Sequence, residues 1–249
     1  MVKEDLVQRS PVRVLMKALG GGLKPGELGV IAAPSGTGKT SVLVQIALDK
    51  LIQGSKVIHV SFAQHTDYVL TWYNNIFDEF LRKKNLEAGQ EVRNEITKNR
   101  VLMKFNQDGL AVDQILRSLR AMIKDGSFTA EYIIVDGYFF TVQDRENVLK
   151  FREFGKELGL SLWFSCNVKD ESFFDKRKIP VVIAEYADLF DVIAVLEPKN
   201  AVKSNISADL RISGEPSYID LVFPRNRDVY YPLQPALRLD PRTLLLLEE

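Results

Sequence analysis

The chain has 249 residues, and because 46% of them are hydrophobic it can bury one substantial core. Its 33 lysines and arginines balance its 33 aspartates and glutamates, so no overall charge draws it towards nucleic acid or a membrane surface. The single cysteine, Cys166, excludes an internal disulfide framework and a cysteine-rich zinc site, and fits a reducing compartment.

Targeting and membrane signals are weak in this sequence. The first thirty residues contain no apolar run of signal-peptide length, and no stretch approaches the ~20 apolar residues needed to cross a bilayer. We therefore expect a cytoplasmic protein that is not embedded in a membrane, folded as a single domain over residues 1–249.

Along the chain, short β-branched runs alternate with longer segments of helical period, a pattern typical of βαβ units around a mostly parallel sheet. The runs expected to be buried strands are residues 28–32, 56–60, 132–135, 160–164 and 191–196. One amphipathic helix is expected to begin near Gly38 and to stop at Gly54, and another covers residues 112–122.

Two further stretches complete the expected α/β fold. Residues 81–100 are charged along their length and are expected to form a solvated helix, with an insertion as the alternative. Beyond Pro198, short strand candidates follow one another without long helices, at residues 210–212, 218–223 and 243–247. This part of the sequence favours an antiparallel extension of the sheet.

The strongest motif is APSGTGKT at residues 33–40, which follows the first expected strand and opens into the first amphipathic helix. It has the form of a P-loop, with Ala33 where glycine is more common. Small residues such as Gly36 and Gly38 let backbone N–H groups converge on phosphate oxygens at a helix N-terminus, and Lys39 adds a positive charge. We expect the triphosphate of ATP or a close relative to be bound by Pro34, Ser35, Gly36, Thr37, Gly38, Lys39, Thr40 and Ser41.

A magnesium site is expected beside this loop. The Thr40 hydroxyl suits Mg²⁺, and a second oxygen ligand is usually an acid at the end of a neighbouring buried strand. Asp136 follows the expected strand 132–135 and meets this requirement. The alternative is that Asp136 is an ordinary acidic residue at a strand end.

Residues 20–28, GGGLKPGEL, precede the loop in a way that resembles the RecA-like ATPases, especially the branch of DnaB-type replicative helicases and KaiC-type clock ATPases. The resemblance continues at residues 223–228, FPRNRD, which are similar to the family's Lys-Asn-Arg segment, and at residues 239–243, LDPRT, which are similar to its final turn. It implies a RecA-like P-loop NTPase fold with a mostly parallel twisted sheet, ATP and Mg²⁺ as ligands, and a homo-oligomer such as a hexameric ring.

In that family, positive side chains of the Lys-Asn-Arg segment reach the γ-phosphate held by a neighbouring subunit. By this resemblance Arg225 and Arg227 are candidate catalytic residues acting across a subunit boundary. A guanidinium suits this role because it spreads positive charge over the oxygens of a transferring phosphoryl group. The alternative is a pair of exposed arginines in a β-turn.

The sequence departs from the family after the second strand, where the family carries a water-activating glutamate. Residues 60–65 read VSFAQH, so Gln64 stands near that position. A neutral amide can hold a water molecule but cannot accept its proton as a carboxylate can. Asp67 or His65 could substitute, and the alternative for both is a polar, solvated loop.

Two other positions follow from the resemblance. The family's polar γ-phosphate sensor corresponds to Cys166 or Asn167 at the end of the strand that begins near residue 160. The following residues 169–178 mix phenylalanines with basic residues, which could contact nucleic acid, although acidic residues in the same stretch cancel the charge.

These observations lead to one principal functional hypothesis and two alternatives. The principal hypothesis is an ATP-binding RecA-like module with slow or absent hydrolysis, in which nucleotide binding controls assembly or partner binding. The first alternative is an active DNA-dependent ATPase of the helicase or recombinase type. The second, a structural relic that binds no nucleotide, is disfavoured by Lys39, Thr40 and Asp136.

Overall fold

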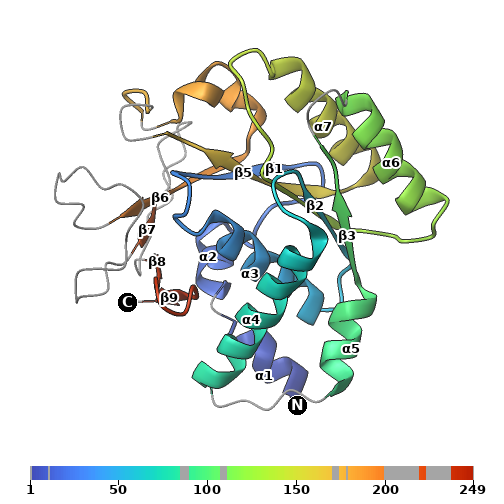
Figure 1. The fold of residues 1–249 in the computed structure, drawn as a ribbon, viewed down its shortest axis with the longest axis vertical. Coiled ribbons are helices and arrows are strands. Elements are labelled where there is room, and N and C mark those ends of the chain that lie inside the picture. The colour runs from blue at the N-terminus through green and yellow to red at the C-terminus, as the bar shows by residue number, and fades with distance from the viewer. Residues whose placement is uncertain are drawn as a thin grey trace.

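The computed structural model of the protein describes residues 2–10, 12–84, 90–106, 111–169, 174–177, 179–198, 219–222 and 237–248. A central β-sheet lies between two layers of helices (Figure 1). This confirms the α/β fold expected from the alternation of strand and helix patterns. None of the helices in the described part of the chain combines the length and the hydropathy that crossing a bilayer requires.

The sheet has nine strands in the order β3-β2-β4-β5-β1-β6-β7-β8-β9, and the pairings from β3 to β6 are parallel. The parallel strands are β1 (Leu28–Ala33), β2 (Val57–Ser61), β3 (Arg100–Lys104), β4 (Tyr132–Asp136), β5 (Ser161–Asn167) and β6 (Val192–Pro198). The five runs predicted as strands are therefore present, each shifted by a few residues at most. Because the strands are parallel, their carboxyl ends meet at one edge of the sheet.

The helices cover the two faces of the sheet unequally (Figure 1). One face carries α1 (Val2–Gln8), α2 (Arg13–Ala18), α3 (Lys39–Ile52), α4 (Thr66–Lys84) and α5 (Gln90–Lys98). The other carries α6 (Val112–Lys124), α7 (Arg145–Leu158) and the 3₁₀ segment η2 (Val181–Leu189). Each layer buries its own apolar cluster against the sheet, so α3 is nearly surrounded and most of its residues are buried.

The region between β2 and β4 differs most from expectation. The charged stretch 81–100 is not one helix: α4 ends at Lys84, α5 covers Gln90–Lys98, and β3 begins at Arg100. The strand was missed because β3 contains one β-branched residue, Val101, and lies half buried at the edge of the sheet. Its helices are also less solvated than expected, since Ile96 is buried in the core.

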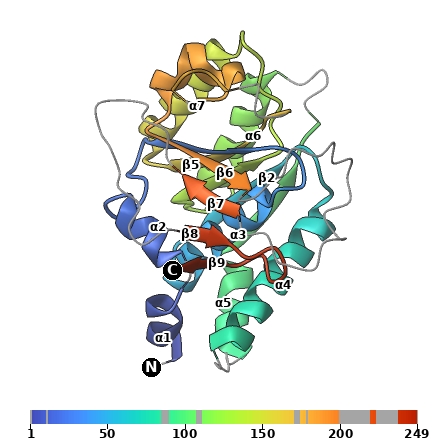
Figure 2. The same ribbon diagram turned by 90° about the vertical axis from the view of Figure 1, so that its left-hand side faces the viewer.

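The predicted antiparallel extension is present. Strands β7 (Ile219–Val222), β8 (Leu237–Leu239) and β9 (Leu246–Glu248) continue the sheet beyond β6 with antiparallel pairings. Figure 2 shows β8 and β9 on the side of the sheet that carries α3. The strand expected at residues 243–247 begins only at Leu246, because residues 240–245 form a turn. The strand expected at residues 210–212 lies outside the described residues.

Candidate functional site

The 34–38 loop connects β1 to α3 and needs glycine at two places. Gly38 has a φ of 103° and caps the start of α3, and Gly36 has a φ of 78°. A Cβ atom on Gly38 would lie 2.3 Å from the Leu239 side chain, so a larger residue would clash as well as strain the backbone. Thr37 closes the loop by donating its hydroxyl to the Pro34 carbonyl at 2.5 Å. The glycines thus let the chain turn directly into α3, whose first backbone N–H groups have no partner within the helix.

Lys39 is folded against the same loop. Its Nζ donates to the carbonyl oxygens of Ala33 at 2.9 Å and Pro34 at 2.7 Å, and the residue is 8% exposed. Burial lowers the pKa of the Lys39 ammonium from 10.5 to about 8, while the Asp136 carboxylate opposes that shift. The side chain is therefore still mostly charged at neutral pH, and its ammonium group lies against the carbonyls at the start of the loop.

Thr40 and Asp136, predicted from sequence to share one site, are in direct contact. The Thr40 hydroxyl donates to Asp136 Oδ2 at 2.8 Å. The other carboxylate oxygen, Oδ1, accepts a hydrogen bond of 2.6 Å from the Ser165 hydroxyl of β5, a residue that the sequence analysis did not select. Ser165 in turn accepts the Gly137 N–H at 2.7 Å. The neighbouring strands β4 and β5 and the start of α3 therefore meet at one carboxylate.

The segment after β2 packs against the backbone of Asp136 and Gly137. Phe62 donates its backbone N–H to the Asp136 carbonyl at 2.8 Å, and a Cβ on Gly137 would lie 2.7 Å from that of Ala63. The Gln64 backbone is held by Ser61, whose hydroxyl contacts its N–H and carbonyl at 3.0 and 2.9 Å. The Oε1 atom of Gln64 is buried and has no hydrogen-bond partner among the described residues.

His65 and Asp67 form a separate pair outside this network. His65 Nδ1 lies 3.2 Å from Asp67 Oδ2, and the side chains are 57% and 85% exposed. Both side chains are solvated, as the alternative for these residues expected, but Asp67 lies in the first turn of α4 and not in a loop.

The end of β5 separates the two sensor candidates. Cys166 lies in the apolar cluster on the opposite face of the sheet from Ser165, and burial raises the pKa of its thiol to about 12. Asn167 is exposed at the end of the strand, where it pairs in register with Ala33 just before the loop. Asn167 is therefore the candidate with an exposed side chain at this end of the strand.

Two groups of predicted site residues fall wholly or partly outside the described residues. Arg225 and Arg227 lie outside the described residues, as do residues 170–173 and 178 of the aromatic and basic stretch. Of that stretch, Phe174 packs against the core, and Arg177 forms an ion pair of 2.7 Å with Asp175. In the described part of the stretch, Phe174 and Arg177 thus already have partners within the chain.

A groove of about 330 Å³ lies between α4 and the turn that precedes β9. Its walls combine aromatic, polar and charged side chains, namely Tyr68, Thr71, Trp72, Asn75, Ile76, Glu79, Arg242, Thr243 and Leu244. Leu244 also contacts Ser41 in the first turn of α3, so the groove begins close to the 34–38 loop. We call it the α4 groove.

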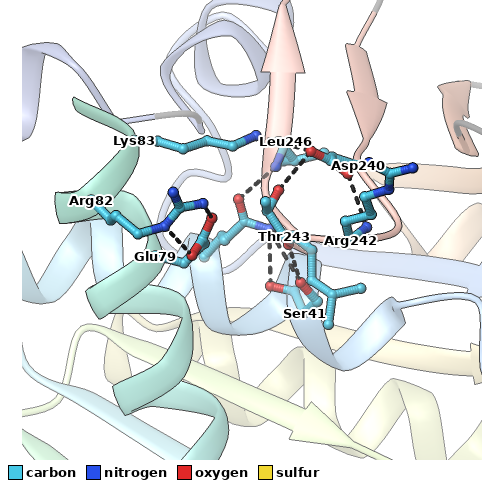
Figure 3. A network of polar contacts seen from close by, with 10 residues as sticks. Ser41, Glu79, Arg82, Lys83, Asp240, Arg242, Thr243 and Leu246 are labelled. Carbon is cyan, nitrogen blue, oxygen red and sulfur yellow. Dashed lines mark hydrogen bonds and ion pairs between the residues drawn. The ribbon is translucent and has the colours of Figure 1, made fainter. Parts of the chain in front are cut away.

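The turn beside the groove is fixed by a network of polar contacts (Figure 3). The Leu244 carbonyl accepts from Ser41 Oγ at 2.5 Å and Gln45 Nε2 at 2.9 Å, and Gln45 Oε1 accepts the Leu246 N–H at 2.8 Å. Asp240 binds Lys83 of α4 at 2.9 Å. These contacts fix the turn that forms one wall of the α4 groove. They also hold Leu244 at a φ of 57°, which is unusual for leucine.

Comparisons with known proteins add no family to this description. No protein-family profile matches the chain, and no curated protein matches it.

Neither Ser165 nor the α4 groove was predicted from the sequence. Ser165 carried one signal, because it lies two residues before the exposed Asn167 and strand side chains alternate between faces. The groove carried none, because its walls come from α4 and from residues 242–244, two segments that lie far apart in the sequence.

Proposed function

We propose that the chain is a RecA-like P-loop protein that binds ATP with Mg²⁺, and that bound nucleotide controls its assembly or partner binding. The 34–38 loop and the N-terminus of α3 supply backbone N–H groups and a favourable dipole for phosphate oxygens. Lys39, at the first position of α3, would add a positive charge for the outer phosphates. Ser35 and Ser41 flank this cradle, with Ser41 in the first turn of α3.

The residues beside the loop fit a magnesium ion. Mg²⁺ prefers oxygen ligands and in nucleotide sites is held by one or two protein groups together with phosphates. Thr40 and Asp136 present a hydroxyl and a carboxylate in contact at 2.8 Å, and these two residues would hold the ion. A bound Mg²⁺ would neutralise part of the phosphate charge.

The α4 groove is the proposed place for the nucleoside. It starts at Leu244 next to Ser41, and it offers the Tyr68 and Trp72 rings together with polar groups. Ligand sites typically combine apolar or aromatic walls with a few polar groups that fix orientation. The groove thus provides room for a base next to the turn that Ser41 and Gln45 bind.

We expect hydrolysis to be slow. The residue near the position of the family's glutamate is Gln64, whose Oε1 atom is buried without a hydrogen-bond partner among the described residues. An amide can orient a water molecule but cannot take its proton at neutral pH. The closest acid further along the chain, Asp67, is exposed and paired with His65.

The observation that carries the proposal is the Thr40–Asp136 hydrogen bond, because it joins the start of α3 to the end of β4 next to a glycine-rich loop. The test is calorimetric titration of the wild-type protein with Mg-ATP, Mg-GTP and ATP in EDTA. The proposal expects one saturable site per chain that prefers the magnesium complex. Light scattering with and without Mg-ATP then tests whether nucleotide promotes association of a second copy.

A further inference from the structure

Ser165 occupies a place that the proposed nucleotide chemistry does not by itself require. It lies on β5 between the strands that carry the 34–38 loop and Asp136, and it is 2% exposed. Its hydroxyl donates to Asp136 Oδ1 at 2.6 Å and accepts the Gly137 N–H at 2.7 Å. The hydroxyl thus donates to the Asp136 carboxylate and accepts from the peptide that follows it.

These contacts constrain the Asp136 carboxylate from two sides. Thr40 holds Oδ2 and Ser165 holds Oδ1, so the plane of the carboxylate cannot rotate without breaking a charge-assisted hydrogen bond. Without Ser165, one buried oxygen would lose its partner, and the side chain could turn towards another donor. The bond from Gly137 also fixes the backbone just beyond Asp136, where φ is 79°.

We propose that Ser165 is a positioning residue, whose hydroxyl holds Asp136 in the orientation that meets Thr40 and a divalent cation bound with a nucleoside triphosphate. The proposal rests on the function proposed above and assigns to Ser165 a share of the metal affinity. Groups that orient a metal ligand typically contribute about 10–100-fold to metal affinity. Ser165 acts through Asp136 and does not touch the nucleotide.

The test uses a pair of variants with the same shape. Ser165→Thr keeps the hydroxyl and Ser165→Val removes it, and both β-branched side chains suit a buried strand. Ser165→Ala is a third variant without added volume. Ser161→Ala is the matched control, because Ser161 is also 2% exposed on β5 but bonds the carbonyls of Leu23 and Lys24, away from Asp136.

The measured quantity is the ratio of the ATP dissociation constant in EDTA to that in excess Mg²⁺, obtained by calorimetry. We expect this ratio to fall about tenfold in Ser165→Val and Ser165→Ala, and to stay near the wild-type value in Ser165→Thr and Ser161→Ala. The dissociation constant in EDTA should stay within about twofold of wild type in all four. Without any ligand, Ser165→Val should melt about 4 °C below Ser165→Thr, since a hydrogen bond to a buried carboxylate is lost.

The most informative measurement compares this ratio between the Asp136→Asn variant and the double variant Asp136→Asn, Ser165→Val. If the hydroxyl acts through the carboxylate, the second substitution lowers the ratio no further. An undiminished effect in that background, or an unchanged ratio in Ser165→Val alone, overturns the positioning role. Those outcomes differ from failure of the proposed function, in which the wild-type protein itself binds no ATP or binds it without regard to Mg²⁺.

Discussion

Thr40 and Asp136 are joined by a hydrogen bond of 2.8 Å although 96 positions separate them in the chain. The contact arises because β1 and β4 are parallel strands of one sheet, so the residues that follow them emerge at the same edge. It makes the loop after β1 and the acid of β4 parts of one polar centre.

Trp72 should report nucleotide binding by its fluorescence. The protein has two tryptophans, and Trp163 is 1% exposed in the core whereas Trp72 lines the α4 groove. Mg-ATP should therefore change the emission of the wild-type protein, and the change should disappear in Trp72→Phe while binding is retained. Trp72→Ala should weaken binding by roughly tenfold or more, because stacking of a base on an aromatic ring contributes about 1–3 kcal/mol. A signal that persists in Trp72→Phe would place the nucleoside elsewhere.

Gln45→Leu should destabilise the protein. The Gln45 amide bonds the backbone of Leu244 and Leu246, and it is 3% exposed, so leucine would leave the Leu246 N–H without its partner in the core. We expect the free energy of unfolding to fall by about 2–4 kcal/mol in urea titrations, in line with the cost of unpaired buried polar groups. Gln114→Leu on the exposed side of α6 serves as the control. Equal stability of the two variants would contradict the role given to Gln45.

His59 should make stability sensitive to acid. This residue of β2 is fully buried, and burial lowers the pKa of its ring to about 4. The unfolded chain takes up the proton near pH 6.5, before the folded protein does, so the free energy of unfolding falls as the pH drops from about 6.5 towards 4. The loss should approach about 3 kcal/mol at the acid end of this range.

The comparison that isolates this effect uses both histidines of the chain. His59→Gln should remove that part of the pH dependence, whereas His65→Gln, at a side chain that is 57% exposed, should keep the wild-type profile. Parallel profiles for wild type and His59→Gln would show that His59 is not buried in its neutral form.

Much of the fold was predictable because local patterns and tertiary packing agree. The strands β1, β4 and β5 are apolar runs buried on both faces, and such runs are visible in sequence. Strand β3 was not predictable, since its pairing with β2 and not its composition makes it a strand. The turn at residues 240–245 is set by Asp240 and by contacts to α3, which lie far away in sequence.

The candidate site divides in the same way. Lys39, Thr40 and Asp136 could be selected because they stand at fixed positions relative to strands. Ser165 was harder to select, because its spacing from Asn167 indicates only which face of the strand it occupies and not that Asp136 is its partner. The choice between Cys166 and Asn167 required the register of β5, which turns Cys166 towards the opposite apolar cluster.

Gln64→Glu should raise the rate of ATP hydrolysis. One general base typically contributes about 10²–10⁴-fold, and the backbone at Gln64 is already fixed by Ser61. Ala63→Glu is tested in parallel, because Ala63 is the exposed residue next to Gly137. Single-turnover rates keep slow product release from hiding the effect. The contrary result is rapid hydrolysis by the wild-type protein that Asp67→Asn abolishes and that substitution of Gln64 leaves unchanged. It would support the active DNA-dependent ATPase.

The central claim is that the 34–38 loop with Lys39 binds the phosphates of ATP, and calorimetric titration of nucleotide-free wild-type protein with Mg-ATP tests it most directly. We predict saturable binding at one site per chain, weakened about 100-fold in Lys39→Ala, since a hydrogen bond from a charged group contributes about 1.5–3 kcal/mol. Lys84→Ala, an exposed lysine at the end of α4, should bind as wild type does. Absence of saturable Mg-ATP binding to the folded wild-type protein, or equal binding by Lys39→Ala, would contradict the account.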